Sequence, residues 1–497
     1  MLSGSNRELR SGMLGKHILG YLPVQIARAV VGFGGVAILT RLMPTEMYGQ
    51  YALALAAMHI TAMAFHTWLD AAVARFHARA DARGHLASHL ATIYSSFAFV
   101  GTGVIILGGI ALWAAPLNIE LKTALGFGLA ALTLRSILAI GIESRRAAGQ
   151  VAAYSMFETA NVLGGFALGI AILMATPLGA AGPIAGMALA SLITLFFEFP
   201  SQARKSATGK PRKRRAMLYF AYGLPVSISL VFEHLLSAGD RFLIAGLMNE
   251  AAVGIYAAGY GLADRTIDIL FIWLGTAATP LMIRALEKEG PDAARRVAGQ
   301  SARVMGLIGF PAATGLALVA APLSTVMVGE EYRAGATLIL PWIALAGLMK
   351  GLMTYYFHES FILKRKTRWM AAIMGGAAVF NISLNLVLIP VFGIAGAAAA
   401  TLVSYTLSLV ACAAIGRALF PLPLPWLDWG RSALAAGVMA LVVYALPVQG
   451  PAILVLLAKA ALGGAVYVAI ALALNIAGCR SWLGIAQSWW RPAEARP

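Results

Sequence analysis

The sequence predicts an all-α, polytopic membrane protein with about fourteen transmembrane helices. Of its 497 residues, 60% are hydrophobic and 12% are charged, whereas soluble proteins average about half apolar and about a quarter charged. The mean hydropathy is +0.78, and the apolar residues fall in runs of about 20, the length that a helix needs to cross about 30 Å of hydrocarbon. Helices satisfy their backbone polar groups internally, so helical spans are expected.

The first apolar run follows three basic residues, Arg7, Arg10 and Lys16. It is too long for the apolar region of a signal peptide and contains Arg28 near its centre, so we expect it to be the first span. The expected spans cover residues 18–40, 49–69, 91–114, 122–142, 151–175, 178–199, 217–237, 254–281, 303–322, 337–361, 369–389, 394–416, 432–447 and 453–477.

The net charge of +17 reflects basic residues that gather between the expected spans. A basic run from Arg204 to Arg215 separates two spans, which indicates a topology signal and argues against nucleic-acid binding. With a cytoplasmic N-terminus, the outer loops contain only four basic residues, Arg41, Lys122, Arg241 and Arg333. This asymmetry predicts that both termini are cytoplasmic.

Two short matches indicate an internal repeat. Residues 42–52 and 247–257 are identical at five of eleven positions, and Gly179-Ala-Ala-Gly182 is similar to Gly393-Ile-Ala-Gly396. The predicted organisation is a six-helix half at 1–199, a basic cytoplasmic linker at 200–216, a second six-helix half at 217–416, and two further helices with a cytoplasmic tail at 417–497. Both halves begin on the same side of the membrane, as in transporters with parallel repeats, so the substrate path should lie between them.

Three segments resemble the polysaccharide (O-antigen-type and exopolysaccharide, Wzx-like) flippases. Residues 40–51 (TRLMPTEMYGQY) resemble the first outer loop of that family, residues 238–242 with 253–256 its seventh-to-eighth span region, and residues 385–397 its eleventh-to-twelfth. The family belongs to the multidrug, oligosaccharidyl-lipid and polysaccharide exporter superfamily.

The resemblance implies two six-helix halves around a V-shaped central cavity, which work by alternating access in a bacterial cytoplasmic (inner) membrane. It implies a polyprenyl-diphosphate-linked oligosaccharide as substrate and no covalent chemistry, so that the protein would not be an enzyme. Membrane lipids, a polysaccharide polymerase and a chain-length regulator are the expected partners. A monomer suffices, because the two halves enclose the path.

Charged residues inside the spans are the candidate site, because a charge at the centre of the bilayer costs at least about 2.5–3.5 kcal/mol unless it is paired or hydrated. Four cations, Arg28, Arg135, Arg265 and Lys350, could form a cavity whose charge matches the substrate diphosphate. Alternatively, they neutralise acids of the bundle, with Arg265 close to Asp264 and Asp268, and Arg135 opposite Glu158 of the next span.

The same acids, Asp264, Asp268 and Glu158, are candidates for coupling transport to a proton or sodium gradient. Tyr355 and Tyr356 follow Lys350 and could stack on sugar rings, although interfacial or packing tyrosines are more common in membrane proteins. We expect no metal site and no cofactor, because the histidines of the spans have no third ligand at helical spacing.

Other function classes fit the sequence less well. The chain has no G-x-x-x-x-G-K-[ST] motif, and so no signature of an ATPase. A multidrug or cation antiporter of the same superfamily would need an acidic cavity, whereas the first span contains Arg28 and no acid. A flippase for the lipid-linked peptidoglycan precursor is chemically closer, because that substrate is also a polyprenyl diphosphate. A membrane-embedded ligase or polymerase would need catalytic residues on a long outer loop.

Overall fold

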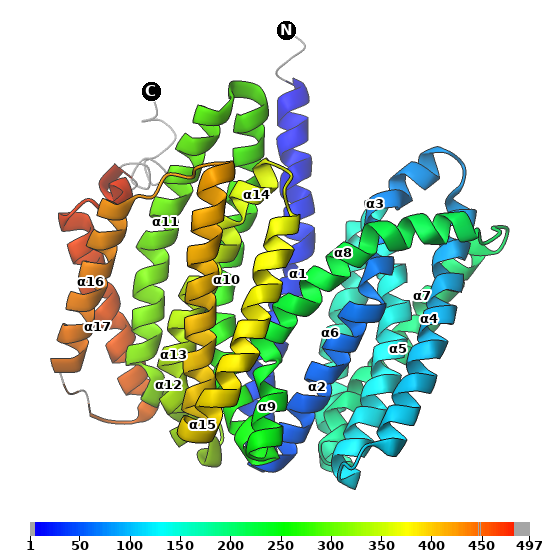
Figure 1. The fold of residues 1–497 in the computed structure, drawn as a ribbon, viewed down its shortest axis with the longest axis horizontal. Helices are drawn as coiled ribbons and strands as arrows, with labels where there is room; N and C mark the ends of the chain where they lie inside the picture. The colour runs from blue at the N-terminus through cyan, green and yellow to red at the C-terminus, as the bar shows by residue number, and fades with distance from the viewer. Residues whose placement is uncertain (1–4, 446, 448, 482–497) are drawn as a thin grey trace. The chain divides into compact units, whose positions relative to one another are not determined.

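The computed structural model describes residues 5–481 except residues 446 and 448, with side chains from residue 20 onward. This part of the chain is helical throughout, without strands, which confirms the predicted fold class. The longer helices (Figure 1) are α1 (Ser5–Leu42), α2 (Thr45–Phe65), α3 (Thr67–Ala82), α4 (Leu86–Ala114), α5 (Ile119–Ala147), α6 (Val151–Ala175), α7 (Ala181–Ser206), α8 (Lys213–Ala238), α10 (Glu250–Glu289), α11 (Pro291–Leu318), α13 (Arg333–Leu352), α15 (Arg368–Leu419), α16 (Trp426–Ala445) and α17 (Ala452–Ala473). The shorter ones are α9 (Asp240–Leu247), α12 (Ala320–Met327) and α14 (Glu359–Leu363), which a π-helical turn at Met353–Phe357 separates from α13.

Within the described residues, twelve helices are long and apolar enough to cross a membrane, or thirteen when α2 and α3 count as one span bent by 47°. The 52 residues of α15 are too many for one crossing, because a straight helix of that length would measure about 78 Å, more than twice the hydrocarbon thickness. The protein is therefore a multi-pass membrane protein, and the number of fourteen spans stays a prediction.

Helix α15 is a hairpin of two legs. Its backbone leaves the helical conformation at Gly393, where φ is 57° and ψ is −138°. Asn381 Nδ2 on the first leg donates a hydrogen bond to Ser404 Oγ on the second, with an N–O distance of 3.3 Å. Figure 1 shows these legs in yellow and orange. The turn separates the expected spans 369–389 and 394–416.

The hairpin has a counterpart in α6 and α7. Gly179, between those two helices, has a φ of 52°, close to the 57° of Gly393 at the matching sequence position. Asn161 of α6 donates to Ser191 Oγ of α7 over 3.1 Å, as Asn381 does to Ser404. These equivalent features support the internal repeat.

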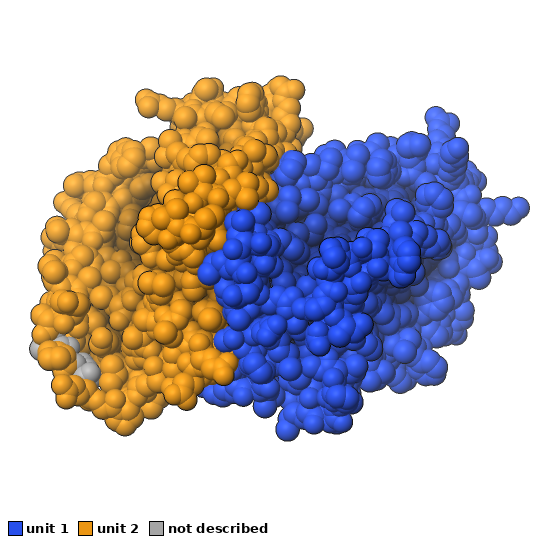
Figure 2. Space-filling model, turned by 60° about the horizontal axis from the view of Figure 1, so that its bottom comes forward, with its two compact units in different colours: residues 1–254 blue, residues 255–497 orange. Residues whose placement is uncertain are grey.

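The chain divides into two compact units, residues 1–254 and 255–497 (Figure 2). The first unit includes α8, which follows the predicted linker at 200–216, because α8 packs tightly against α3 and α4. A Cβ on Gly223 would lie 2.6 Å from Trp68 Cα, and His89 Nδ1 lies 2.6 Å from the Tyr219 hydroxyl. The predicted six-helix halves, 1–199 and 217–416, follow the internal repeat and differ from these two compact units. The division into halves stays a prediction.

The N-terminal ends of α2 and α10 cross at two glycines in the first unit. A Cβ on Gly49 would lie 1.8 Å from the Glu250 carbonyl oxygen, and a Cβ on Gly254 would lie 2.0 Å from that of Thr45. Gly49 and Gly254 are equivalent in the first sequence match, so the repeated segments contact one another through the same position. The Glu250 carboxylate accepts hydrogen bonds from Gln50 Nε2 at 2.6 Å and Asn118 Nδ2 at 3.0 Å.

We expect Gly49→Ala to lower the free energy of unfolding by about 1–3 kcal/mol, since the added methyl group overlaps backbone atoms that cannot rotate away. The midpoint of thermal unfolding of the purified protein measures the effect. Gly126→Ala in α5 is the control, because a Cβ there meets nothing within 4 Å. Equal midpoints for the two variants would contradict the prediction, because they would show that the two helix ends can move apart without a loss of unfolding free energy.

Candidate functional site

The first charged cluster lies in the first unit, on the face of α6 that carries Glu158. Helix α6 is held close to α7 by small residues, and a Cβ on Gly186 would lie 2.1 Å from the backbone nitrogen of Gly169. Such close approach of two backbones is typical of helix packing in membranes. It fixes the rotation of α6, so that Asn161 contacts α7 and Glu158, nearly one turn earlier, lies between α1 and α5.

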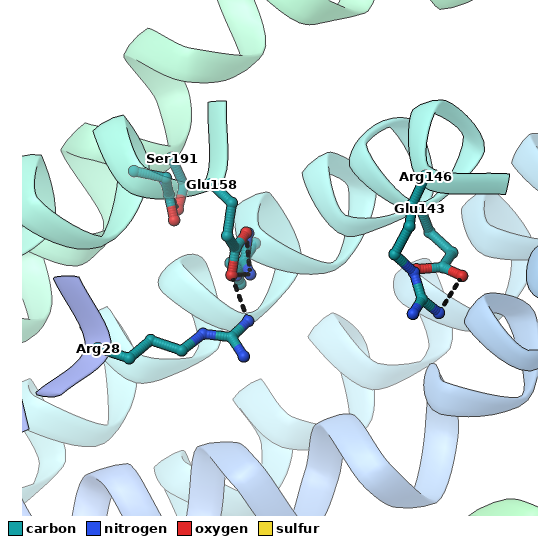
Figure 3. Close-up of polar contacts among 7 residues, drawn as sticks. Arg28, Glu143, Arg146, Glu158 and Ser191 are labelled. Carbon is teal, nitrogen blue, oxygen red and sulfur yellow. Dashed lines mark hydrogen bonds and ion pairs between the residues drawn. The ribbon is translucent and has the colours of Figure 1, made fainter. Parts of the chain in front are cut away.

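Glu158 is a carboxylate between two guanidinium groups. Its Oε1 accepts a hydrogen bond from Arg28 Nη2 of α1, and both of its oxygens accept from Arg135 Nη2 of α5, all at 2.8 Å (Figure 3). The Glu158 side chain is 3% exposed, whereas those of Arg28 and Arg135 are 50% and 34% exposed. The three groups together have a net charge of +1.

The two arginines have hydrogen-bonding capacity that Glu158 does not use. Arg135 Nη1 is buried and has no hydrogen-bond partner among the described residues. Half of the Arg28 side chain is exposed, so its guanidinium can contact a second anion. The cluster can therefore bind an additional anionic group, for which two adjacent guanidinium forks provide charge-assisted hydrogen bonds.

Neighbouring ion pairs strengthen the end of α5 next to this cluster. Arg146 and Glu143 form a bidentate pair with N–O distances of 2.7 and 2.8 Å (Figure 3). Arg145 Nε donates to Glu198 Oε2 of α7 at 2.7 Å, and Glu198 is 1% exposed. The first pair lies within α5, whereas the second joins α5 to α7.

A second cluster lies in the second unit, between α10 and α13. Lys350 Nζ is 3.0 Å from Asp264 Oδ1 and 3.6 Å from Asp268 Oδ1. The helices approach closely because Gly351 contacts Phe271 and Gly347 contacts Ile267, where a Cβ would lie 2.3 and 3.1 Å from the neighbouring side chain. The lysine side chain is 13% exposed and the two aspartates are 23% and 30% exposed.

This second cluster has a net charge of −1, the opposite of the first. Two carboxylates one helical turn apart lie beside the ammonium group of Lys350, an arrangement that can take up a proton or a cation. Arg265 is exposed on α10, and both aspartates lie close to Lys350 of α13. In the part of the chain that the structure describes, no three metal-ligating side chains gather at one place.

The two tyrosines next to Lys350 differ in their surroundings. The Tyr356 side chain is completely buried, and its hydroxyl donates a hydrogen bond to the Pro423 carbonyl. Tyr356 thus packs in the protein interior, and stacking on a sugar would require it to leave this position. The Tyr355 ring stacks on Phe271, with a centroid distance of 6.3 Å and an interplanar angle of 15°.

The structure brings Arg28, Arg135 and Glu158 together, and separately Lys350, Asp264 and Asp268. Pairing of Arg135 with Glu158 was one of the two sequence-based alternatives. The contacts of Arg28 with Glu158 and of Lys350 with Asp264 were not predicted, because the partners are 130 and 86 residues apart. A charged residue within an apolar run was the only signal for them in the sequence.

Comparisons with known proteins identify the family and the fold of the chain. A family described as polysaccharide biosynthesis protein matches residues 38–336. The probable flippase AglR of Haloferax volcanii is 28% identical over 213 residues, and the match covers 41% of this chain and 43% of that relative, less than half of either.

Two solved structures have the same fold. The lipid II flippase MurJ in an inward closed conformation is 12% identical with a TM-score of 0.78, over 92% of this chain and 99% of that one. An inward-facing multidrug resistance MATE family transporter of the MOP superfamily is 11% identical with a TM-score of 0.63, over 78% of this chain and 97% of that one. The chain therefore belongs to the family of polysaccharide biosynthesis proteins, and its fold is that of these transporters.

Proposed function

We propose that this protein is a flippase that moves a polyprenyl-diphosphate-linked oligosaccharide from the cytoplasmic to the outer leaflet, by alternating access, for polysaccharide biosynthesis. The main support for the proposal is the cationic cluster of Arg28, Arg135 and Glu158, which lies within membrane-spanning helices. The chain also belongs to the family of polysaccharide biosynthesis proteins. The excess charge of this cluster is positive, as an anionic diphosphate requires.

The diphosphate must lose water on the way across the membrane, so its charge needs a replacement for hydration. The exposed parts of the Arg28 and Arg135 side chains provide donors for phosphate oxygens. In the absence of substrate, Glu158 serves as the counter-ion of both arginines and lowers the cost of burying them. Substrate and Glu158 then compete for the same guanidinium groups, which keeps binding reversible.

The second cluster is the proposed site of ion coupling. Asp264 and Asp268 are two carboxylates one helical turn apart beside Lys350, and either can take up a proton or a sodium ion. The basic residues at the ends of the helices suggest that both termini are cytoplasmic. Substrate then enters from the side on which it is synthesised, and the ion gradient supplies the free energy.

Transport of the lipid-linked peptidoglycan precursor is the second candidate function. The fold similarity to the lipid II flippase favours it, and the same cationic cluster suits either diphosphate. The two substrates differ in the glycan that the diphosphate carries. A multidrug antiporter is less consistent with Arg28 and Arg135, because a cationic drug would be repelled by the first cluster.

We expect vesicles that contain the purified protein to move a fluorescent polyprenyl-diphosphate oligosaccharide between leaflets, and Arg28→Ala to slow this movement about tenfold or more. A hydrogen bond to a charged group contributes about 1.5–3 kcal/mol, which corresponds to such a factor. Loss of fluorescence on adding a membrane-impermeant quencher measures the leaflet exchange.

Arg83→Gln is the matched control, since this exposed arginine lies in the connection between α3 and α4 and outside both clusters. Equal rates for native protein and Arg28→Ala would contradict the assignment of the site. Movement of a peptidoglycan precursor in preference to the oligosaccharide would favour the second candidate, and movement of neither would contradict the proposed function.

Asp268→Asn should make the transport rate independent of a proton or sodium gradient, because the asparagine neither binds a proton nor attracts a cation. The same vesicle assay, run with and without each gradient, measures the dependence. Glu289→Gln at the exposed end of α10 removes the same charge from the same helix and should leave the dependence intact. A gradient response that survives in Asp268→Asn would exclude this residue from coupling.

A further inference from the structure

A cavity of about 520 Å³ lies in the second unit, at the end where α15 stops and α16 starts. It is lined by residues of α11, of the segment at 357–360, of the last turns of α15 and of the connection at 421–424. Arg295 and Arg417 are the charged residues among those that line it, and no acid is present in the lining. No residue of either cluster described above lines the cavity.

Both arginines have unused hydrogen-bond donors. Arg295 contacts Asp292 through Nη1 at 2.8 Å and lies over the ring of Phe420, but its Nε is buried without a hydrogen-bond partner in the described residues. Arg417 is exposed and forms no hydrogen bond or ion pair with any residue that the structure describes. Two guanidinium groups with free donors, and no acid in the lining, favour an anion with several oxygens, such as a phosphate.

The surface next to the cavity is apolar. Trp426 lines the cavity and is 69% exposed, which is typical of an indole at the membrane–water interface. From there, Leu427, Leu434 and Leu441 follow at seven-residue spacing along one face of α16 and are 66%, 62% and 70% exposed. A ligand that places a phosphate in the cavity can therefore lay hydrocarbon chains along this face.

We propose that this cavity binds the phosphate of an anionic phospholipid, whose acyl chains lie on the exposed face of α16. Basic pockets between transmembrane helices commonly bind such head groups on the cytoplasmic side. The bound lipid would connect α11, the end of α15 and the start of α16 through one phosphate. It would thereby tie α16 to the helices before it, independently of the substrate that the protein carries.

The test is binding of fluorescent phosphatidylglycerol to the purified full-length protein in a neutral detergent. Arg417→Gln and Arg295→Gln should each weaken binding about fivefold, the factor expected for one cation at a membrane surface. Arg296→Gln, an exposed neighbour on α11 that does not line the cavity, removes the same charge and should leave binding unchanged. Arg417→Lys should retain most of the binding, because the positive charge remains.

Four competitors identify the source of the phosphate. Unlabelled phosphatidylglycerol should displace the probe, whereas phosphatidylcholine and inorganic phosphate should do so only at much higher concentration. Equal binding by Arg417→Gln, Arg295→Gln and the native protein would overturn the proposal. So would displacement by inorganic phosphate as effective as by the lipid, or displacement by polyprenyl phosphate at a lower concentration than by phosphatidylglycerol. The assay does not involve transport, so its outcome is separate from that of the proposed function.

Discussion

A charged side chain in the hydrocarbon core of a membrane needs an opposite charge or water beside it. This requirement explains why the charged residues of both clusters lie in contact with residues of opposite charge. Moving one charged side chain to the centre of the bilayer costs at least about 2.5–3.5 kcal/mol. In the first unit one carboxylate, Glu158, lies between two guanidinium groups, and in the second one ammonium, Lys350, lies beside two carboxylates. The charges of the three named groups sum to +1 in the first cluster and to −1 in the second. In the proposed function, the first cluster binds the diphosphate and the second binds the coupling ion.

The ion pairs depend on close packing of the helices that carry them. Without a hydrophobic effect between helices in lipid, contact between backbones comes from small residues. Gly169 and Gly186 allow α6 to touch α7, and Gly347 and Gly351 allow α13 to approach α10. A larger residue at these positions would move the charged side chains away from their partners. The glycines therefore connect the apolar composition of the chain with the geometry of its charged sites.

The sequence was sufficient for the fold class because apolar runs of span length have one common outcome, a transmembrane helix. The break of α15 was also predictable, since Pro390 and Gly393 separate two such runs. The bend at His66 was not, because neither glycine nor proline marks it. At the sites, the sequence identified charged residues within spans but not their partners. Helical spacing reveals neighbours within one helix, whereas Arg28 and Glu158 meet only after α1 and α6 have packed, 130 residues apart.

If Glu158 occupies the place of an anion that the substrate supplies, its removal should change the equilibrium binding of that substrate. Binding of a polyprenyl diphosphate and of the corresponding monophosphate would be measured calorimetrically for the native protein and for Glu158→Gln. We expect tighter binding of the diphosphate than of the monophosphate, and a further gain in affinity for Glu158→Gln, because the competing carboxylate is lost while the size of the side chain is kept. Equal affinity for the two lipids, with no change in the variant, would contradict it.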